Sequence, residues 1–254
     1  MILFRYDKSF EGLLCVVFEA YTLKLFPEKL IAENEPPPLF ADPVITVSSD
    51  KAKANRVWKG LEKKMTPGGL SFVTMTWLSE LPEVDMLLFR YICKTLDSPQ
   101  SIELNFGDPD ILEVSKIWKK VSNEKERIIQ FTRFQKTSDN IFFAPVEPVH
   151  NVLSLVIKHF QDRFACQKWI IYDMKRDYGY FYDLSTVTEI HFENKPTSSP
   201  SGKLDEDLLA EDERMFQKLW KEYFKSITIK ERINPKLHRQ NLPVRFWKYL
   251  PEKQ

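Results

Sequence analysis

His150 and Asn151 are the residues of this chain whose types and setting best suit chemistry on an anion. An imidazole changes its charge near neutral pH, and an amide both donates and accepts hydrogen bonds. The pair lies where a predicted strand gives way to a predicted helix, and the free N–H groups of a helix start attract anions. Simple capping by Asn151 explains the pattern equally well. If the chain is an enzyme, His150 is the candidate acid or base, with Asp173 as its orienter or as a metal ligand.

His159 and Arg163 are four residues apart on the helix predicted over residues 148–164, so they share one face. The pair could hold a phosphate, or it could be a solvated pair above an apolar neighbour. Nine residues from His150 to His159 correspond to about 900° of helix rotation, which places them on opposite faces. We therefore expect no shared metal ion, and one partly buried and one surface histidine is the favoured interpretation.

A hairpin predicted over residues 169–183 gathers charged and aromatic side chains. Asp173 and Arg176 lie at its turn, and Tyr178 opens its second strand. Aromatic rings beside basic groups can stack on nucleobases and contact phosphates. Alternating tyrosines are also typical of any half-buried strand, which is the favoured interpretation for each tyrosine taken alone.

Basic and aromatic residues dominate residues 214–254, where eleven Lys or Arg meet three acids. This composition suits nucleic-acid backbones and unstacked bases. The residues expected to contact phosphate or base here are Arg232, Asn234, Arg245, Trp247 and Lys248. A helix that packs its aromatic side chains and leaves its lysines in water is the alternative. Because the whole chain has a net charge of +1, only a local patch of positive charge is expected.

Other classes of function lack their sequence signatures. None of the seven glycines belongs to a P-loop or a dinucleotide-binding fingerprint, and zinc spacings, HExxH and GxSxG are absent, so no cofactor is expected. Cys15, Cys93 and Cys166 stand far apart, which predicts reduced, buried thiols in a cytoplasmic protein. There is no secretory signal and no run of ~20 apolar residues, so no membrane association is expected.

The order of the predicted elements favours the α+β class, with a helix-rich N-terminal part and a hairpin-containing C-terminal part around one core. We expect a single domain over residues 1–254, within which 48–137 could form a helical subdomain. A strand at 2–6 precedes a helix capped by Asp7 or Ser9, and Gly12 inside that helix indicates close packing. The other predicted elements are helices over 49–96 (with a break at 66–69) and 110–135, strands at 42–47, 140–146 and 186–192, and a loop over 194–202.

Several of these segments, taken in order, resemble a bacterial family assigned to DNA metabolism or repair. The segments that carry the resemblance are 6–14, 147–153, 159–160, 163–164, 169–173, 178–179, 182–183, 231–235 and 243–250. Members of that family are encoded beside a radical-SAM protein assigned to DNA repair, or are fused to a uracil-DNA-glycosylase-like domain. The resemblance implies a role in DNA repair and those two kinds of partner, but it supplies no reaction. Lys8 stands where the family's turn leads us to expect glycine.

Three hypotheses follow from these observations. The leading one is a DNA-repair protein that binds nucleic acid or a nucleotide and works with a catalytic partner. The second is an enzyme that acts on a nucleotide or a DNA end through His150 and Asp173. The third is an adapter whose aromatic tail docks a partner protein without touching DNA.

Overall fold

The computed structural model describes residues 1–40, 42–192 and 208–253. Its helices and its two separate sheets confirm the predicted α+β class. The loop predicted over 194–202 lies outside the described residues. No helix in the described ranges is both long and apolar enough to cross a membrane.

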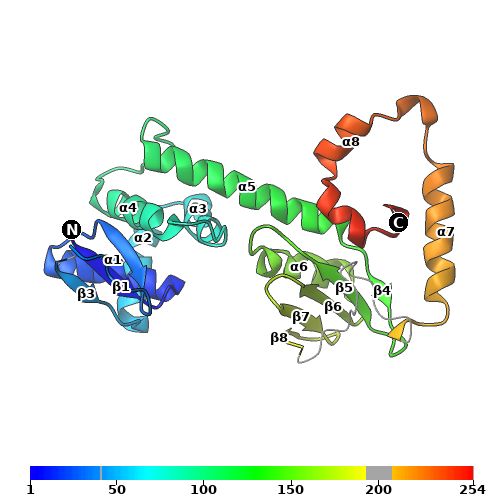
Figure 1. The fold of residues 1–254 in the computed structure, drawn as a ribbon, viewed down its shortest axis with the longest axis horizontal. Helices are drawn as coiled ribbons and strands as arrows, with labels where there is room; N and C mark the ends of the chain where they lie inside the picture. The colour runs from blue at the N-terminus through cyan, green and yellow to red at the C-terminus, as the bar shows by residue number, and fades with distance from the viewer. Residues whose placement is uncertain (41, 193–207, 254) are drawn as a thin grey trace. The chain divides into compact units, whose positions relative to one another are not determined.

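The chain forms two compact units, Met1–Ser122 and Asn123–Gln254. In Figure 1 the first unit is coloured blue to green and the second green to red. The expectation of one domain with a helical subdomain at 48–137 stays a prediction.

The first unit contains a small, fully parallel sheet. Its strands are β1 (Leu3–Tyr6), β2 (Lys29–Ala32) and β3 (Val44–Thr46), in the order β2-β1-β3. Helix α1 (Phe10–Leu23) connects β1 to β2, as parallel pairing requires. The strands predicted at 2–6 and 42–47 are confirmed. Strand β2 was not predicted, since four residues are too few to show a periodicity.

Four further helices follow the small sheet. They are α2 (Lys51–Lys64), α3 (Pro67–Trp77), α4 (Val84–Asp97) and α5 (Pro109–Phe131). The predicted break at 66–69 is confirmed, because Thr66 caps α3 and Pro67 opens it. A second break, at 78–83, was not predicted, and it contains Glu80 and Glu83 in the left-handed region.

The second unit contains a five-stranded mixed sheet. Its strands, in both chain order and sheet order, are β4 (Gln135–Lys136), β5 (Phe142–Val146), β6 (Trp169–Asp173), β7 (Tyr178–Tyr182) and β8 (Val187–Ile190). Only β5 and β6 pair in parallel, and helix α6 (Leu153–Arg163) connects them. The predicted hairpin is confirmed as β6 and β7, with Asp173 opposite Tyr178. The helix predicted over 110–135 was wrong at its end: α5 ends at Phe131, and Gln135 begins β4.

The helix expected to begin at Pro148 begins at Leu153 instead. Residues 149–151 form a bend, in which the N–H of Val149 donates to the carboxylate of Glu124 rather than into a helical turn. His150 therefore lies outside α6, and the argument that His150 and His159 occupy opposite faces of one helix was wrong.

The chain ends in short helical segments. They are α7 (Glu213–Ser226), η2 (Lys230–Arg232), α8 (Pro235–Asn241), η3 (Val244–Tyr249) and η4 (Pro251–Lys253). Helix α7, orange in Figure 1, packs against η4. Most side chains of α7 and α8 are exposed, whereas Phe246, Tyr249 and Leu250 are buried. Residues 245–253 thus belong to the packed part of the unit.

The cysteines correct another expectation. Cys15 and Cys93 are free and buried as predicted, but Cys166 is exposed. Cys166 lies between α6 and β6 in a turn whose residues are largely exposed.

The contacts of Lys8 explain why a lysine stands where the family leads us to expect glycine. Its φ of 58° lies in the left-handed region that glycine adopts without strain. The ammonium donates to Asp85 Oδ2 at 2.5 Å and to the carbonyl of Leu30 at 3.3 Å. Asp85 is buried and also accepts from the hydroxyl of Tyr6 at 2.9 Å. The strained backbone therefore carries a cation that neutralises a buried carboxylate.

Gly12 lies against the end of β1, as its position in the helix indicated. A Cβ at this residue would stand 2.1 Å from Asp7 Oδ1 and 2.9 Å from Tyr6 Cδ2. The Asp7 carboxylate cannot easily move away, because it accepts from Ser9 Oγ at 2.7 Å and from Ser49 Oγ at 2.6 Å. Ser9 is also the N-cap of α1, as predicted.

Gly12→Ala should therefore lower the free energy of unfolding by roughly 1–3 kcal/mol, the range for inserting a methyl into filled space. Gly68→Ala is the matched control in the first turn of α3, where a Cβ would meet Thr66 Oγ1 at an ordinary 3.5 Å. That control should be neutral or stabilising by up to about 1 kcal/mol through helix propensity. Urea unfolding of both variants tests this, and equal stabilities would contradict it.

Candidate functional site

Asp173 lies at the end of β6 and is completely buried. Its carboxylate accepts from the backbone N–H groups of Lys175 (2.9 Å) and Arg176 (3.1 Å) and from Arg176 Nη1 (2.9 Å). The same guanidinium donates to the carbonyls of Pro148 (3.1 Å) and Val149 (3.0 Å). Arg176 thus joins the hairpin turn to the segment 147–151, which the sequence singled out.

Two more carboxylates form ion pairs with the basic residues of η3. Glu124, on α5, is 2% exposed at its side chain, pairs with Arg245 and accepts from the N–H of Val149 at 2.8 Å. Glu147 pairs with Lys248 and accepts from the hydroxyl of Tyr249 at 2.9 Å. The hydrogen bond from the Lys248 ammonium holds the pKa of Glu147 below its ordinary value despite partial burial. Glu124, Glu147 and Asp173 are called the carboxylate cluster below.

His150 and Asn151 lie beside this cluster. His150 is 6% exposed, and the hydroxyl of Tyr178 donates to Asn151 Oδ1 at 2.5 Å. Burial raises the pKa of Tyr178 well above its ordinary value. The structure thus places seven predicted site residues together, namely His150, Asn151, Asp173, Arg176, Tyr178, Arg245 and Lys248.

This arrangement is better suited to holding the fold than to acid–base chemistry. His150 and Asp173 are both buried, and neither lines the two large cavities described next. Every oxygen of Asp173 already accepts a hydrogen bond. Within the described residues, no group of three or more His, Cys, Asp or Glu side chains is arranged to hold a metal ion. The enzyme hypothesis therefore gains no accessible reacting group here.

Two other predicted residues, His159 and Arg163, are exposed on α6. Arg163 lines a cavity of about 1050 Å³ between α6, the sheet edge and α7, which we call the α7 groove. Its walls are largely aromatic, with Phe134, Phe164, Phe216, Trp220 and Tyr223 among them. Arg133 and Lys136 in the same groove pair with Glu252 and Asp212. Arg163 has no carboxylate partner among the described residues, and its guanidinium lies 5.9 Å from the ring of Phe164.

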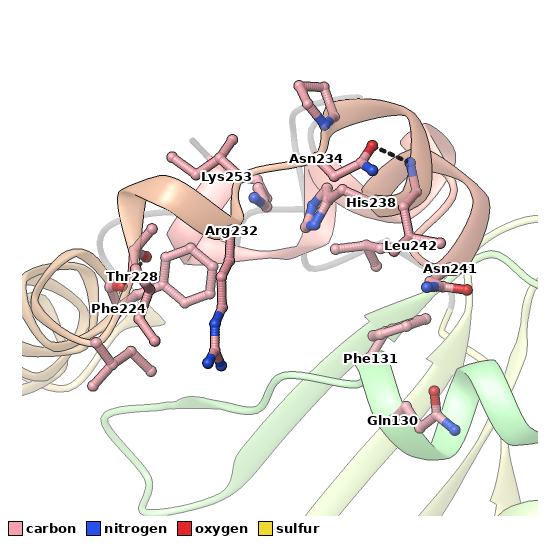
Figure 2. A pocket seen from close by; sticks show the side chains of 15 residues that line it. Gln130, Phe131, Phe224, Thr228, Arg232, Asn234, His238, Asn241, Leu242 and Lys253 are labelled. Atoms are coloured by element: carbon pink, nitrogen blue, oxygen red, sulfur yellow. Dashed lines mark hydrogen bonds between the residues drawn. The ribbon is translucent and has the colours of Figure 1, made fainter.

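A second cavity, of about 870 Å³, lies between the end of α5, the end of α7, η2, α8 and Lys253, and we call it the C-terminal cavity. It contains the predicted residues Arg232 and Asn234 (Figure 2). Asn234 caps α8 by accepting from the N–H of Leu237 at 3.0 Å. Figure 2 shows the Arg232 side chain extending away from η2, with Phe224 on one side of it in this view and Phe131 and Gln130 on the other.

His238 and Lys253 complete the polar part of the C-terminal cavity. Nε2 of His238 is buried and has no hydrogen-bond partner among the described residues. Burial and the nearby Lys253 ammonium lower the pKa of His238. Lys253 lies 5.0 Å from the ring centre of Phe224 and 5.6 Å from that of Trp247. Trp247, also a predicted site residue, is thus adjacent to this cavity rather than to the carboxylate cluster.

The residues that the sequence did not single out are mainly the partners. Glu124 is one acid among several on α5, and only its burial distinguishes it. Glu147 belongs to the segment 147–151, but no local sequence pattern indicates that it pairs with a lysine 101 residues away. His238 and Lys253 carry no motif at all. Their roles arise from contacts between distant parts of the chain.

The fold defines an α+β protein whose second unit carries several ligand-sized cavities, among them the α7 groove and the C-terminal cavity, and whose described residues form no recognisable catalytic constellation. Residues 82–252 match the family described as a domain of unknown function, DUF4130, and the chain belongs to that family. The match includes the carboxylate cluster, the α7 groove and the lining of the C-terminal cavity except Lys253, but not residues 6–14.

The other comparisons add little. No curated protein matches the chain. Among solved structures, the pGpG-specific phosphodiesterase PggH from Vibrio cholerae is similar over 71% of this chain and 80% of its own, with 15% sequence identity and a TM-score of 0.35. A likeness this distant carries no argument about activity.

The carboxylate cluster leads to a stability prediction. Arg245→Ala leaves the buried Glu124 without its close cation, although Arg127 remains at 3.7 Å. We expect a loss of about 2–4 kcal/mol, near the range for a broken buried pair. Lys248→Ala is the control, because Lys248 and Glu147 are 39% and 40% exposed, and such a pair contributes at most about 1 kcal/mol. Urea unfolding at neutral pH measures both, and equal losses would show that burial does not govern the two pairs.

The pKa of Glu147 gives a pH prediction. A carboxylate whose pKa is lower in the folded than in the unfolded state stabilises the fold above its unfolded pKa, about 4.3, and less as pH falls below it. Lys248→Met removes the hydrogen bond that causes this shift, so stability should fall less steeply between pH about 5 and 3 than in the unaltered chain. The measurement is the free energy of unfolding of both proteins between pH about 5 and 3. An equally steep fall in both would contradict the assignment of the Glu147 pKa shift to Lys248.

Proposed function

We propose that this protein binds nucleic acid through the segment 213–241 of its second unit and acts in DNA metabolism with a catalytic partner. The observation that supports the proposal is that the cationic side chains of the second unit fall into two groups, one paired with buried or half-buried acids and one not. Arg176, Arg245 and Lys248 pair with acids of the carboxylate cluster, whereas most cations of α7, η2 and α8 form no ion pair with a described carboxylate. The segment 213–241 is called the arm below.

The arm contains eight Lys or Arg and three Glu. Lys225 pairs with Glu222 at 3.2 Å. The arm cations that no described carboxylate pairs with are Lys218, Lys221, Lys230, Arg232, Lys236 and Arg239. A row of unneutralised cations attracts a polyanion, and it does so locally even though the whole chain is close to neutral.

Exposed aromatic side chains on the same arm favour unpaired bases as the ligand. Phe216 is 52% exposed, Trp220 38% and Tyr223 55%. The rings of Trp220 and Tyr223 lie 5.7 Å apart at the α7 groove. Stacking on such rings contributes about 1–3 kcal/mol per base. Single-stranded DNA is therefore the form of nucleic acid that the arm suits best.

The role in repair and the partners rest on the family resemblance. It implies a glycosylase-like protein and a radical-SAM protein as the catalytic partners. A nucleic-acid-binding protein without an accessible reacting group would depend on such a partner for chemistry, which agrees with the buried state of His150 and Asp173.

The test is binding of labelled single- and double-stranded DNA at two salt concentrations. The test variant changes four arm lysines to alanine, and these are Lys218, Lys221, Lys230 and Lys236. The control variant removes equal charge from exposed positions of the first unit, and these are Lys51, Lys59, Lys63 and Lys119. Only the arm variant should weaken binding, with the slope of log affinity against log salt falling by about 0.7 for each lysine that contacts single-stranded phosphate.

Two results would count against the proposal. One is an absence of DNA binding by the unaltered protein at low salt. The other is equal weakening by the arm variant and the control variant, because charge would then act without regard to position.

A docking adapter without DNA contact is the second candidate. The exposed apolar side chains of α7 favour it, since Met215, Phe216 and Leu219 are each more than half exposed. Leu219→Glu should then abolish capture of the glycosylase-like or radical-SAM partner. Partner capture that depends on Leu219, together with no DNA binding at low salt, would select this candidate over the first.

A further inference from the structure

The C-terminal cavity combines features that select a ligand more narrowly than a charged surface does. Its volume of about 870 Å³ falls within the ~300–1,000 Å³ typical of small-molecule sites. No Asp or Glu is among the residues that line it. The lining is otherwise mainly apolar, with a few polar side chains, which is the composition that orients an amphipathic ligand.

The two cations of the cavity point to a phosphate. Arg232 is exposed, and no described residue offers it a carboxylate. Lys253 contacts aromatic faces rather than an acid. A guanidinium binds a phosphate with two parallel hydrogen bonds, and an ammonium adds a point charge. A dianionic phosphate monoester would satisfy both cations, whereas an uncharged ligand would leave them uncompensated.

His238 supplies a third polar group that lacks a partner. Its Nε2 is buried without a hydrogen bond, and such groups in folded proteins are nearly always satisfied by protein, water or ligand. Since Nε2 can donate or accept a hydrogen bond, a ligand hydroxyl or a phosphate oxygen would supply the missing partner.

The opposite side of the cavity is suited to a planar base. Phe131 provides aromatic surface, and the side-chain amides of Gln130 and Asn241 stand on the same side of the cavity (Figure 2). An Asn or Gln amide forms two hydrogen bonds with the N6 and N7 edge of adenine. We therefore infer that the C-terminal cavity binds an adenine nucleotide that bears a terminal phosphate monoester, either free or at the 5′ end of a DNA strand.

In this complex Arg232 and Lys253 hold the phosphate, and the base lies toward Phe131 with its edge at Gln130 and Asn241. The inference rests on the proposed function and names the ligand of one part of that surface. The cations outside the cavity would bind phosphodiesters along the strand, whereas the cavity would recognise the monoester at its end.

The experiment is isothermal titration of the full chain with deoxyadenosine 5′-monophosphate, deoxyadenosine and inorganic phosphate. The nucleotide should bind at least tenfold more tightly than either fragment, because only it engages both sides of the cavity. Arg232→Ala should weaken nucleotide binding at least tenfold. Arg239→Ala is the matched control, because Arg239 is also an exposed, unpaired arginine of the arm but does not line the cavity.

Both variants should fold like the unaltered protein, since neither arginine forms a side-chain hydrogen bond or ion pair with a described residue. Circular dichroism of the two variants checks that they are folded. The inference is overturned if the nucleotide shows no saturable binding, if inorganic phosphate binds equally well, or if the two arginine variants behave alike toward the nucleotide. It is supported if Arg232→Ala alone abolishes the binding of the free nucleotide.

A second measurement distinguishes the two sources of the ligand. An adenine-ended single strand with a 5′-phosphate is compared with the same strand ending in a hydroxyl. Tighter binding of the phosphorylated strand that disappears only in Arg232→Ala supports strand-end recognition. If both strands bind alike, depend equally on Arg232 and Arg239, and are not displaced by the nucleotide, the cavity inference fails while nucleic-acid binding by the arm stands.

Discussion

The buried carboxylate of Glu124 is the constraint on which the second unit depends. It lies on α5, accepts a hydrogen bond from Val149 and holds the guanidinium of Arg245. It therefore joins three stretches of chain: the long helix, the segment before α6 and the C-terminal η3. A carboxylate this deeply buried is stable only when it is paired, and η3 supplies that partner through Arg245. That return places η4 against α7 and closes one side of the C-terminal cavity.

Charge in this unit divides into two populations with different roles. Cations close to the carboxylate cluster, such as Arg176, organise backbone carbonyls and acids and are unavailable to a ligand in this conformation. Most cations of the arm form no ion pair with a described carboxylate, and Lys253 of η4 lies against aromatic faces. Composition alone cannot separate the two populations, because Arg245 and Lys248 lie in the same basic stretch as the arm. Burial of the opposing acids separates them, since a desolvated carboxylate draws the nearest cation and a solvated one need not.

The first unit shows the same interplay between backbone and charge at a smaller scale. The turn after β1 needs a residue in the left-handed region, and Lys8 occupies it at a conformational cost that glycine would avoid. Its ammonium reaches Asp85, a buried acid on α4, and so couples the turn to a distant helix. Gly12 one turn later allows Asp7 to approach the helix closely.

The sequence by itself determined the local elements whose signals are local. The hairpin of β6 and β7, the Ser9 cap and the Thr66–Pro67 break follow from alternation and capping within a few residues. Only the tertiary structure decided which predicted site residues meet. His150 lies outside α6 because Val149 donates to Glu124, and Arg245 faces inward because Glu124 is buried. Such pairings join residues more than one hundred positions apart, as Arg245 and Glu124 show, and no short-range pattern encodes a long-range partner. The C-terminal cavity has the same origin, since its polar groups come from separate elements that only the fold brings together.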